Sequence, residues 1–349
     1  MPLLSLPLVG RVAALGPPGG SIAGVGVKPN LDFAAGIPHA LAVLNPLTDR
    51  RVVVAIALLC CLLWGSAVPA VKIGYGLFAI APGDTPSLML FAGVRFFLSG
   101  LILLGYSALT RKPVAQPSGR LGQLLLLGLI STAGQYLFYY IGLAHTTGVK
   151  VSITTSTSTF FSVLLAHFLY ANDKLTAQRI IGCLIGFAGV VAVNLSATGF
   201  DLHISLLGEG FIVIAAALFS IAGVYGKRVS AQMDAGVMTG WQLMLGGAVL
   251  GMTGFMTGGH FGAFGLEAAL LLAYLAALSA IAFALWALLL KHNPVGSIAI
   301  FSCAIPIFGV LLAGLFLGET ILEWKNLAAL LLVSIGIVLV TGSGRKAIA

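Results

Sequence analysis

Residues 121–143 read LGQLLLLGLISTAGQYLFYYIGL and contain no charged side chain. A helix needs roughly twenty consecutive apolar residues to cross the hydrocarbon core of a bilayer, so this run is predicted to span a membrane. Similar runs follow one another along most of the chain, and we expect helices at 52–73, 88–109, 121–143, 150–170, 179–196, 206–226, 236–256, 267–290, 296–317 and 326–341. The sequence therefore predicts an all-α integral membrane protein with ten transmembrane helices.

The composition of the whole chain agrees with this prediction. Hydrophobic residues make up 59% of its 349 residues, charged residues make up 8%, and the mean hydropathy is +1.08. A soluble chain of this length could not bury so much apolar surface. The cysteines at 60, 61, 183 and 303 fall inside predicted spans and lack the spacing of a metal site. No metal and no cofactor are therefore expected.

The net charge of +8 reports topology. If the N-terminus lies inside, most lysines and arginines fall at the inner ends of the helices, and the outer half holds only Lys72, Arg95, Lys150 and Lys325. This positive-inside bias predicts that both termini are cytoplasmic. Lys72 and Lys150 lie at outer helix ends and are expected to snorkel to the headgroups. A nucleic-acid partner would need a contiguous basic face, which these positions do not form.

The second half of the chain repeats the first half at a shift of 147 residues. His145 aligns with His292, and the run VLLA at 163–166 aligns with VLLA at 310–313. Each repeat holds five predicted spans, an odd number, so the second repeat enters the membrane from the opposite side. Inverted repeats of this kind surround a solute site near the midplane that opens to each side in turn. The repeat predicts a transporter in the inner or plasma membrane.

The chain is accordingly predicted to have three parts. Residues 1–49 are rich in glycine and proline and lack the features of a cleaved signal peptide, so we expect a disordered cytoplasmic tail. The first five-helix repeat is expected at 50–197 and the second at 198–349. Glycines recur at four-residue spacing within several spans, which indicates either internal helix packing or a dimer contact. We expect a monomer or a weak dimer.

Several motifs make the chain resemble the drug/metabolite transporter superfamily, in its ten-helix EamA-like branch. The resemblance covers about residues 50–345, and its motifs are LWGS at 63–66, FAGVRF at 91–96, Ser297, PIF at 306–308, LGE at 317–319 and the glycine-rich fifth and tenth helices. It implies a 5+5 inverted repeat that exports small metabolites, often amino acids or related organic molecules. The first repeat departs from the second where Thr159 takes the place of Pro306 and Asn172 the place of Glu319.

Arg95 is a charged residue deep in a predicted span. An ionisable group inside hydrocarbon costs about 2.5–3.5 kcal/mol on insertion scales, so its position needs a reason. Arg95 could face a central cavity and bind a solute carboxylate with its planar guanidinium. It could instead snorkel to the outer headgroups or tie two helices together. Its repeat partner is Gln242, and the site would be asymmetric if both residues line it.

Hydroxyl side chains crowd the predicted fourth helix. The candidates for a solute-lining face are Ser152, Thr155, Ser156 and Thr159, with Ser297 and Ser302 in the predicted ninth helix. Ser152, Thr155 and Thr159 lie on one helical stripe. The same residues could instead hold two close-packed helices together.

Aromatic and amide side chains form a third candidate group. Trp64, Gln135, Tyr139 and Trp286 could line a cavity for an amphipathic solute. The alternative is the aromatic belt at the membrane interface, which fits Trp241 and Tyr140.

The predicted function is secondary export of small organic solutes, amino acids or related carboxylates first. The ten acidic residues fall in the tail, in loops or near helix ends, which argues against a proton relay within the membrane. The sequence also lacks a phosphate-binding loop. An importer and a membrane-embedded enzyme acting on a lipid-borne substrate remain as alternatives, whereas a channel would call for rings of charge or filter loops. The expected partners are a small-molecule solute and the lipid bilayer, with no nucleic acid.

Overall fold

The computed structural model describes residues 47, 49–115, 119–169, 175–195, 204–293 and 298–342. The chain divides into two units, Met1–Leu44 and Asn45–Ala349, and the described residues belong to the second unit. The predicted tail through residue 46 lies outside the described residues. Asn172 and Ser297 also lie outside them.

The described residues form helices and no strand. The helices are α1 (Arg50–Leu77), α2 (Thr85–Leu109), α3 (Leu121–Gly128), η3 (Leu129–Gly134), α4 (Gln135–His145), α5 (Gly148–Thr154), α6 (Thr157–Leu169), α7 (Ala177–Ala192), η4 (Leu206–Gly210), α8 (Phe211–Ser230), α9 (Ala235–Met256), α10 (Leu266–His292), η5 (Ile300–Cys303), α12 (Ala304–Leu317) and α13 (Trp324–Gly342). Here η3 and η4 are π-helical and η5 is a 3-10 helix.

The described part holds 8 helical segments long and apolar enough to cross a membrane, judged by length and composition. Two shorter apolar helices accompany them, Ala177–Ala192 and Phe301–Leu317. Each range predicted from the sequence overlaps one of these segments. The prediction of an all-helical membrane protein is therefore confirmed.

Short polar side chains begin several of the helices. Asp49 accepts a hydrogen bond from the N–H of Arg51 over 2.7 Å before α1, and Asp84 accepts one from Ser87 over 3.1 Å before α2. Such side chains satisfy amide groups that the first turn of a helix leaves without partners. At the other end of α12, Gly318 adopts a left-handed conformation with φ of +66°. Glycine is favoured there because it lacks a Cβ.

The predicted fourth helix is not continuous. It divides into α5 and α6 at Thr155 and Ser156, where the N–H of Ser156 bonds to the carbonyl of Ile153, three residues back. The hydroxyl of Thr155 also bonds to the carbonyl of Val151 over 2.7 Å. Hydroxyl side chains that compete for backbone carbonyls bend a helix, and here the competition accompanies a break. At the 147-residue shift Thr155 corresponds to Ser302, within the 3-10 segment η5.

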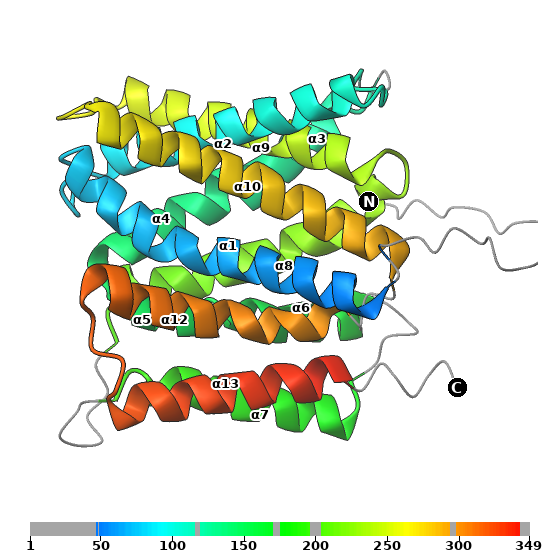
Figure 1. Ribbon diagram of the computed structural model, residues 1–349, viewed down its shortest axis with the longest axis vertical. Coiled ribbons are helices and arrows are strands. Elements are labelled where there is room, and N and C mark those ends of the chain that lie inside the picture. Colours follow the sequence, from blue (N-terminus) through cyan, green and yellow to red (C-terminus); the bar gives the residue numbers. More distant parts are fainter. Residues whose placement is uncertain are drawn as a thin grey trace, which may run out of the picture. The chain divides into compact units, whose positions relative to one another are not determined.

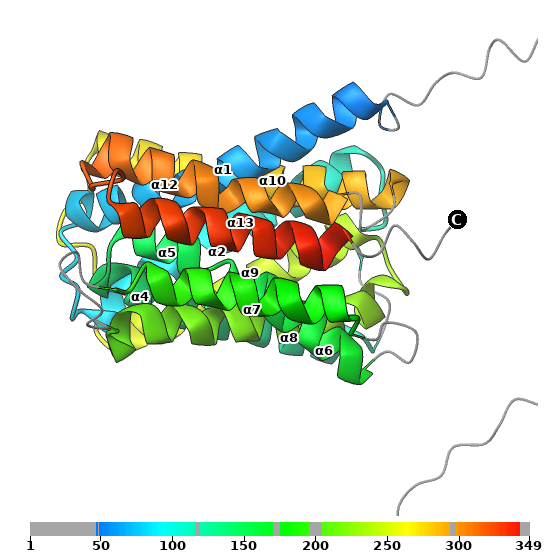
Figure 2. The same ribbon diagram turned by 90° about the horizontal axis from the view of Figure 1, so that it is seen from below.

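The helices of the described unit run side by side (Figure 1). The α2 and α9 helices pack together on one side of the unit, and α7 and α13 pack together on the other (Figures 1 and 2). Between them, α1 packs against both α10 and α12. We call the end where α1 begins and α13 finishes the terminal end, and the opposite end, where α1 and α12 finish, the distal end.

Some of the closely spaced glycines pack inside the bundle. A Cβ placed on Gly93 of α2 would collide with the backbone of Gly251 in α9. On the other side, a Cβ on Gly182 of α7 would lie 3.0 Å from the carbonyl oxygen of Gly336 in α13. These glycines let two backbones approach. The internal-packing interpretation is therefore correct for Gly251, which faces Gly93, and for Gly182, which faces Gly336.

Candidate functional site

Arg95 is buried at the meeting point of three helices. Its side chain projects from α2, and the residue is 4% exposed. Nη1 donates a hydrogen bond to the hydroxyl of Tyr140 in α4, and Nη2 donates one to the hydroxyl of Ser279 in α10, each over 3.0 Å. The guanidinium carbon also lies 4.7 Å from the ring centre of Phe96. Arg95 therefore ties helices together in this structure and does not snorkel to the headgroups.

The charge of Arg95 meets no carboxylate among the described residues. The ion pairs of that part of the chain use the acidic residues Asp234, Glu209, Glu319 and Glu323, and none of them includes Arg95. The Nε of Arg95 has no hydrogen-bond partner in the structure. A buried charge is ordinarily paired or neutralised, so this guanidinium is left with neutral hydrogen-bond partners and with Nε unused.

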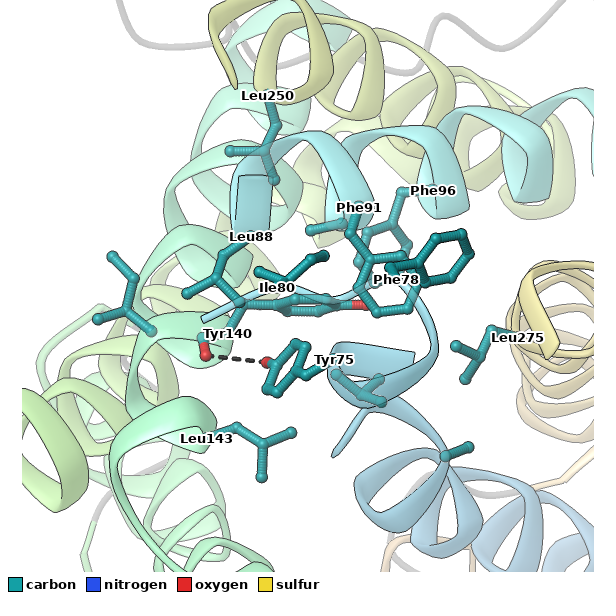
Figure 3. Close-up of a cluster of buried hydrophobic side chains, with 14 of the residues drawn as sticks. Tyr75, Phe78, Ile80, Leu88, Phe91, Phe96, Tyr140, Leu143, Leu250 and Leu275 are labelled. Carbon is teal, nitrogen blue, oxygen red and sulfur yellow. Dashed lines mark hydrogen bonds between the residues drawn. The ribbon is translucent and has the colours of Figure 1, made fainter. Parts of the chain in front are cut away.

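A cluster of aromatic rings holds Tyr140 in place. The Tyr75 hydroxyl donates a hydrogen bond to the backbone carbonyl of Tyr140 over 2.9 Å, as the dashed line in Figure 3 marks. The rings of Phe91 and Tyr136 lie 5.7 and 6.4 Å from that of Tyr140, both edge-to-face. Tyr140 is 1% exposed, so the prediction that it belongs to an interfacial belt is wrong. Its packing fixes the hydroxyl that Arg95 contacts.

One face of α10 connects Arg95 to a second aromatic cluster. Ser279, Phe283 and Trp286 are spaced four and three residues apart and so lie on the same face of the helix. The ring of Trp64 in α1 lies 5.7 Å from that of Phe283 and 5.1 Å from that of Trp286. Trp64 and Trp286 are only half-buried. The arrangement places the guanidinium of Arg95 and a half-buried pair of tryptophan rings against successive turns of α10.

The predicted hydroxyl residues bond mainly to their own helices. The hydroxyl of Ser152 donates to the carbonyl of Gly148, and that of Ser302 donates to the carbonyl of Ala299, each over 2.7 Å. Near the break between α5 and α6, Ser156 is buried and Thr159 is half-buried. The hydroxyl oxygen of Thr154 is buried there without a partner in the structure.

The other predicted site residues lie on separate helices. Gln135 is buried at the start of α4, and Tyr139 is half-buried, with its ring 6.0 Å from that of Tyr136. Gln242, the repeat partner of Arg95, is half-buried on α9. The structure thus brings Arg95 close to the α4 tyrosines and Trp64 close to Trp286.

Two lysines at the distal end are paired with glutamates. The Lys72 Nζ lies 3.3 Å from an oxygen of Glu319, and the Lys150 Nζ lies 3.0 Å from an oxygen of Glu209. Each of these lysines therefore has a carboxylate partner, which the snorkelling interpretation did not include. A pocket of about 620 Å³ at this end is lined by Ala144, His145, Thr146, Thr147, Lys150, Ile204, Ser205 and Glu209.

Sequence reasoning missed Ser279, Glu209 and Glu319 as contact residues. Ser279 stands alone among apolar residues in the middle of α10, and an isolated hydroxyl of this kind is a signal that could have marked it. The two glutamates could have been found by matching lysines and carboxylates predicted to lie at the same ends of their helices.

Comparisons with known proteins agree with this architecture. The EamA-like transporter family matches the chain twice, over residues 51–195 and 206–342. The protein named "Uncharacterized transporter YvbV" from Bacillus subtilis is 28% identical over 72% of this chain and 82% of its own length. The "Probable amino-acid metabolite efflux pump" of Salmonella typhimurium is 25% identical over 80% of this chain and 91% of its own length. A crystal structure of a protein 20% identical in sequence superposes with a TM-score of 0.61 over 84% of this chain and 98% of the other.

Proposed function

This chain belongs to the EamA-like transporter family, and from that premise we propose that it exports small organic solutes that carry a carboxylate group. It is a multi-pass membrane protein and a transporter. Amino acids and related amphipathic carboxylates are the proposed substrates, moved by alternating access.

The observation that carries the proposal is the buried guanidinium of Arg95, which has no carboxylate beside it in the described part of the chain. A solute carboxylate would supply the missing negative charge and two acceptor oxygens, and charge-assisted hydrogen bonds are roughly twice as strong as neutral ones. The hydroxyls of Tyr140 and Ser279 now occupy two of the guanidinium donors. Because Nε is unused, the solute could add a bond before it displaces either hydroxyl.

The apolar part of the solute would contact the aromatic rings of Trp64 and Trp286. These rings lie further along the α10 face that carries Ser279, so a solute bound by Arg95 could lie along α10. Large rings supply apolar contact area with little loss of side-chain freedom. The remaining proposed lining residues are Gln135, Tyr139, Ser152, Thr155, Ser156, Thr159, Gln242 and Ser302.

We also propose the 5+5 inverted repeat, with repeats at 50–197 and 198–349 and both termini in the cytoplasm. Two observations support this topology. The family matches the chain in two consecutive segments, and the irregular positions at Thr155 and Ser302 correspond at the repeat shift. The beginning of α1 and the end of α13 also lie at the same end of the unit (Figure 1), as an even number of spans requires.

Transport assays in proteoliposomes test this function. An amino acid and its carboxamide differ in the carboxylate, so the pair isolates the contact that we propose for Arg95. We expect wild-type protein to move the acid and Arg95→Gln to lose that movement, while the matched control Met256→Leu, at a position 80% exposed, transports normally. Equal transport of acid and amide by wild type would contradict the carboxylate preference.

Direction is tested with protein inserted in one known orientation. With the same solute gradient imposed from either side in turn, movement away from the face that corresponds to the cytoplasm should saturate and should be the faster of the two. Faster net movement toward that face would favour the importer. Turnover of a lipid by the purified protein, without solute movement, would favour the membrane enzyme.

A further inference from the structure

We propose that Glu209 and Glu319 form a latch that closes the distal end by holding the turn between α4 and α5. The latch segment is Thr146–Lys150, which comprises the two connecting residues and the first turn of α5. The proposal rests on the alternating access proposed above, since a latch has a function only if this end opens. It assigns a role to two carboxylates that the proposed solute site does not use.

Glu319 holds the latch segment through its backbone. The carboxylate follows α12 and accepts hydrogen bonds from the N–H groups of Gly148 and Val149, over 2.7 and 2.8 Å. Lys72 of α1 reaches the same carboxylate, with its Nζ 3.3 Å from an oxygen. One carboxylate therefore joins the start of α5 to α1 and to the end of α12.

Glu209 holds the same segment through side chains. It accepts a hydrogen bond from the hydroxyl of Thr146. It also forms an ion pair with Lys150, whose Nζ lies 3.0 Å from a carboxylate oxygen. The backbone N–H of Ser205 donates to its other oxygen over 2.8 Å. The side chain of Glu209 is 5% exposed, so the carboxylate is ordered by several donors and largely shielded from solvent.

The contacts of both glutamates cross between the two segments that match the family. Thr146, Gly148 and Lys150 fall in the segment 51–195, whereas Glu209 and Glu319 fall in the segment 206–342. Separation of the two segments at the distal end would therefore break both ion pairs and both backbone contacts together. This coupling distinguishes a latch from ion pairs within one repeat.

Close packing beside Glu319 shows that the latch segment fits tightly in this state. A Cβ on Gly148 would lie 3.1 Å from Leu317 Cδ1 and 3.2 Å from both Ala313 Cβ and Val68 Cγ1. The fit is confined to the α5 half of the broken span, because α5 packs against α12 whereas α6 packs mainly against α8. The break at Thr155 and Ser156 provides a place where α5 could swing without moving α6.

A reversible crosslink tests the latch directly. A Cβ built on Gly208 lies 3.1 Å from the Cβ of Thr146, close to the spacing of about 3.5–4.5 Å that a disulfide requires. In Thr146→Cys/Gly208→Cys protein, oxidation should stop solute movement by at least tenfold, and reduction should restore it. In each of the two single variants, the rate of solute movement should be the same before and after oxidation. Full transport in fully crosslinked protein would overturn the latch and leave the proposed solute untouched.

Labelling tests the latch without any solute. Ala313 is 0% exposed beside Gly148, so Ala313→Cys should react slowly with a membrane-impermeant maleimide. Adding Glu209→Gln and Glu319→Gln should raise that rate severalfold. The matched control Asp234→Asn removes an ion pair with Lys112 that also joins the two segments, but near the terminal end, and it should leave the rate unchanged. An unchanged rate in the glutamate variants, in protein that still elutes as folded, would contradict the latch.

Discussion

Nη1 of Arg95 lies 3.0 Å from the hydroxyl oxygen of Tyr140, and this contact joins a buried cation to a neutral partner. The same guanidinium reaches Ser279 through Nη2 and leaves Nε without a partner. A structural ion pair would have placed a carboxylate at this position. The contacts with Tyr140 and Ser279 account for the structural role of Arg95, which joins three helices. The proposed role in transport is a separate one, because it needs an anion from solution.

Arg95→Lys keeps the charge and removes the planar fork. A lysine ammonium is a compact point charge and cannot bind two carboxylate oxygens side by side. We expect the apparent kcat/KM for a carboxylate solute to fall by about tenfold or more, equivalent to about 1.4 kcal/mol, in a proteoliposome flux assay. Unchanged flux with Lys would leave Arg95 with a structural role alone.

Tyr140→Phe removes the hydroxyl that accepts from Nη1 of Arg95. A buried donor left without a partner costs about 1–3 kcal/mol, so Tm in detergent should fall. Tyr106→Phe is the matched control because Tyr106 is 57% exposed on the same helix as Arg95. A saturating carboxylate solute should recover part of the lost Tm by satisfying the freed donor. No recovery would count against a solute contact at Arg95.

Trp286→Ala should weaken binding of solutes with a large apolar part. The half-buried ring lies edge-to-face against Trp64, and loss of apolar contact worth about 1.4 kcal/mol corresponds to a tenfold rise in KM. A small carboxylate with no ring or long chain should show little change. Trp324→Ala serves as the control, since Trp324 is 54% exposed. Equal effects on large and small solutes would point to a loss of folding rather than of contact.

Gly93→Ala should separate α2 from α9. The added methyl group would collide with the backbone of Gly251, and overpacking in a close-packed interior costs about 1–3 kcal/mol. At Gly105 on the same helix, a Cβ would meet nothing within 4 Å. Gly105→Ala should instead raise stability slightly, because alanine favours helix by about 0.5–1 kcal/mol over glycine. Thermal unfolding of the two variants compares them directly, and equal Tm values would contradict the close approach.

Asp234 should make the stability of the protein fall as the pH is lowered into the acidic range. Burial acts to raise the pKa of Asp234, but the hydrogen bonds from Lys112 and from the N–H groups of Val237 and Gly236 outweigh it, so its pKa lies below the ordinary value of 3.8. Because the pKa is lower in the folded state, the ionised carboxylate stabilises the fold at pH values above the unfolded-state pKa. This stabilisation is lost as the pH falls through the folded-state pKa.

Asp234→Asn therefore should lower Tm at pH 7, and the difference from wild type should vanish as the pH falls through the folded-state pKa of Asp234. The difference at pH 7 should be small, within about 1 kcal/mol, because the pair with Lys112 is partly exposed and asparagine also caps helices. A Tm difference that persists unchanged at the lowest pH would show that the carboxylate charge is not its cause.

Particular residues show where sequence reasoning was sufficient and where it failed. The spans were predictable because about twenty consecutive apolar residues are enough to predict a membrane-spanning helix. Several glycines were also recognisable as packing positions from their four-residue spacing. The fourth span was predicted as one helix because periodicity at 150–170 does not reveal that Thr155 turns its hydroxyl back to Val151. The partners of Lys72 and Lys150 were not predicted because the glutamates that they contact are 247 and 59 residues away in sequence.

The sequence by itself determined the solvent of this protein, its helical class and its family, because the length and polarity of each apolar run are local properties that a bilayer selects directly. Only the tertiary structure decided that Arg95 meets Tyr140 and Ser279 and that Glu209 and Glu319 hold one turn. Those contacts depend on which faces of separate helices pack together. A side chain in a low-dielectric interior must find its partner across that packing, and no window of sequence contains both members of the pair.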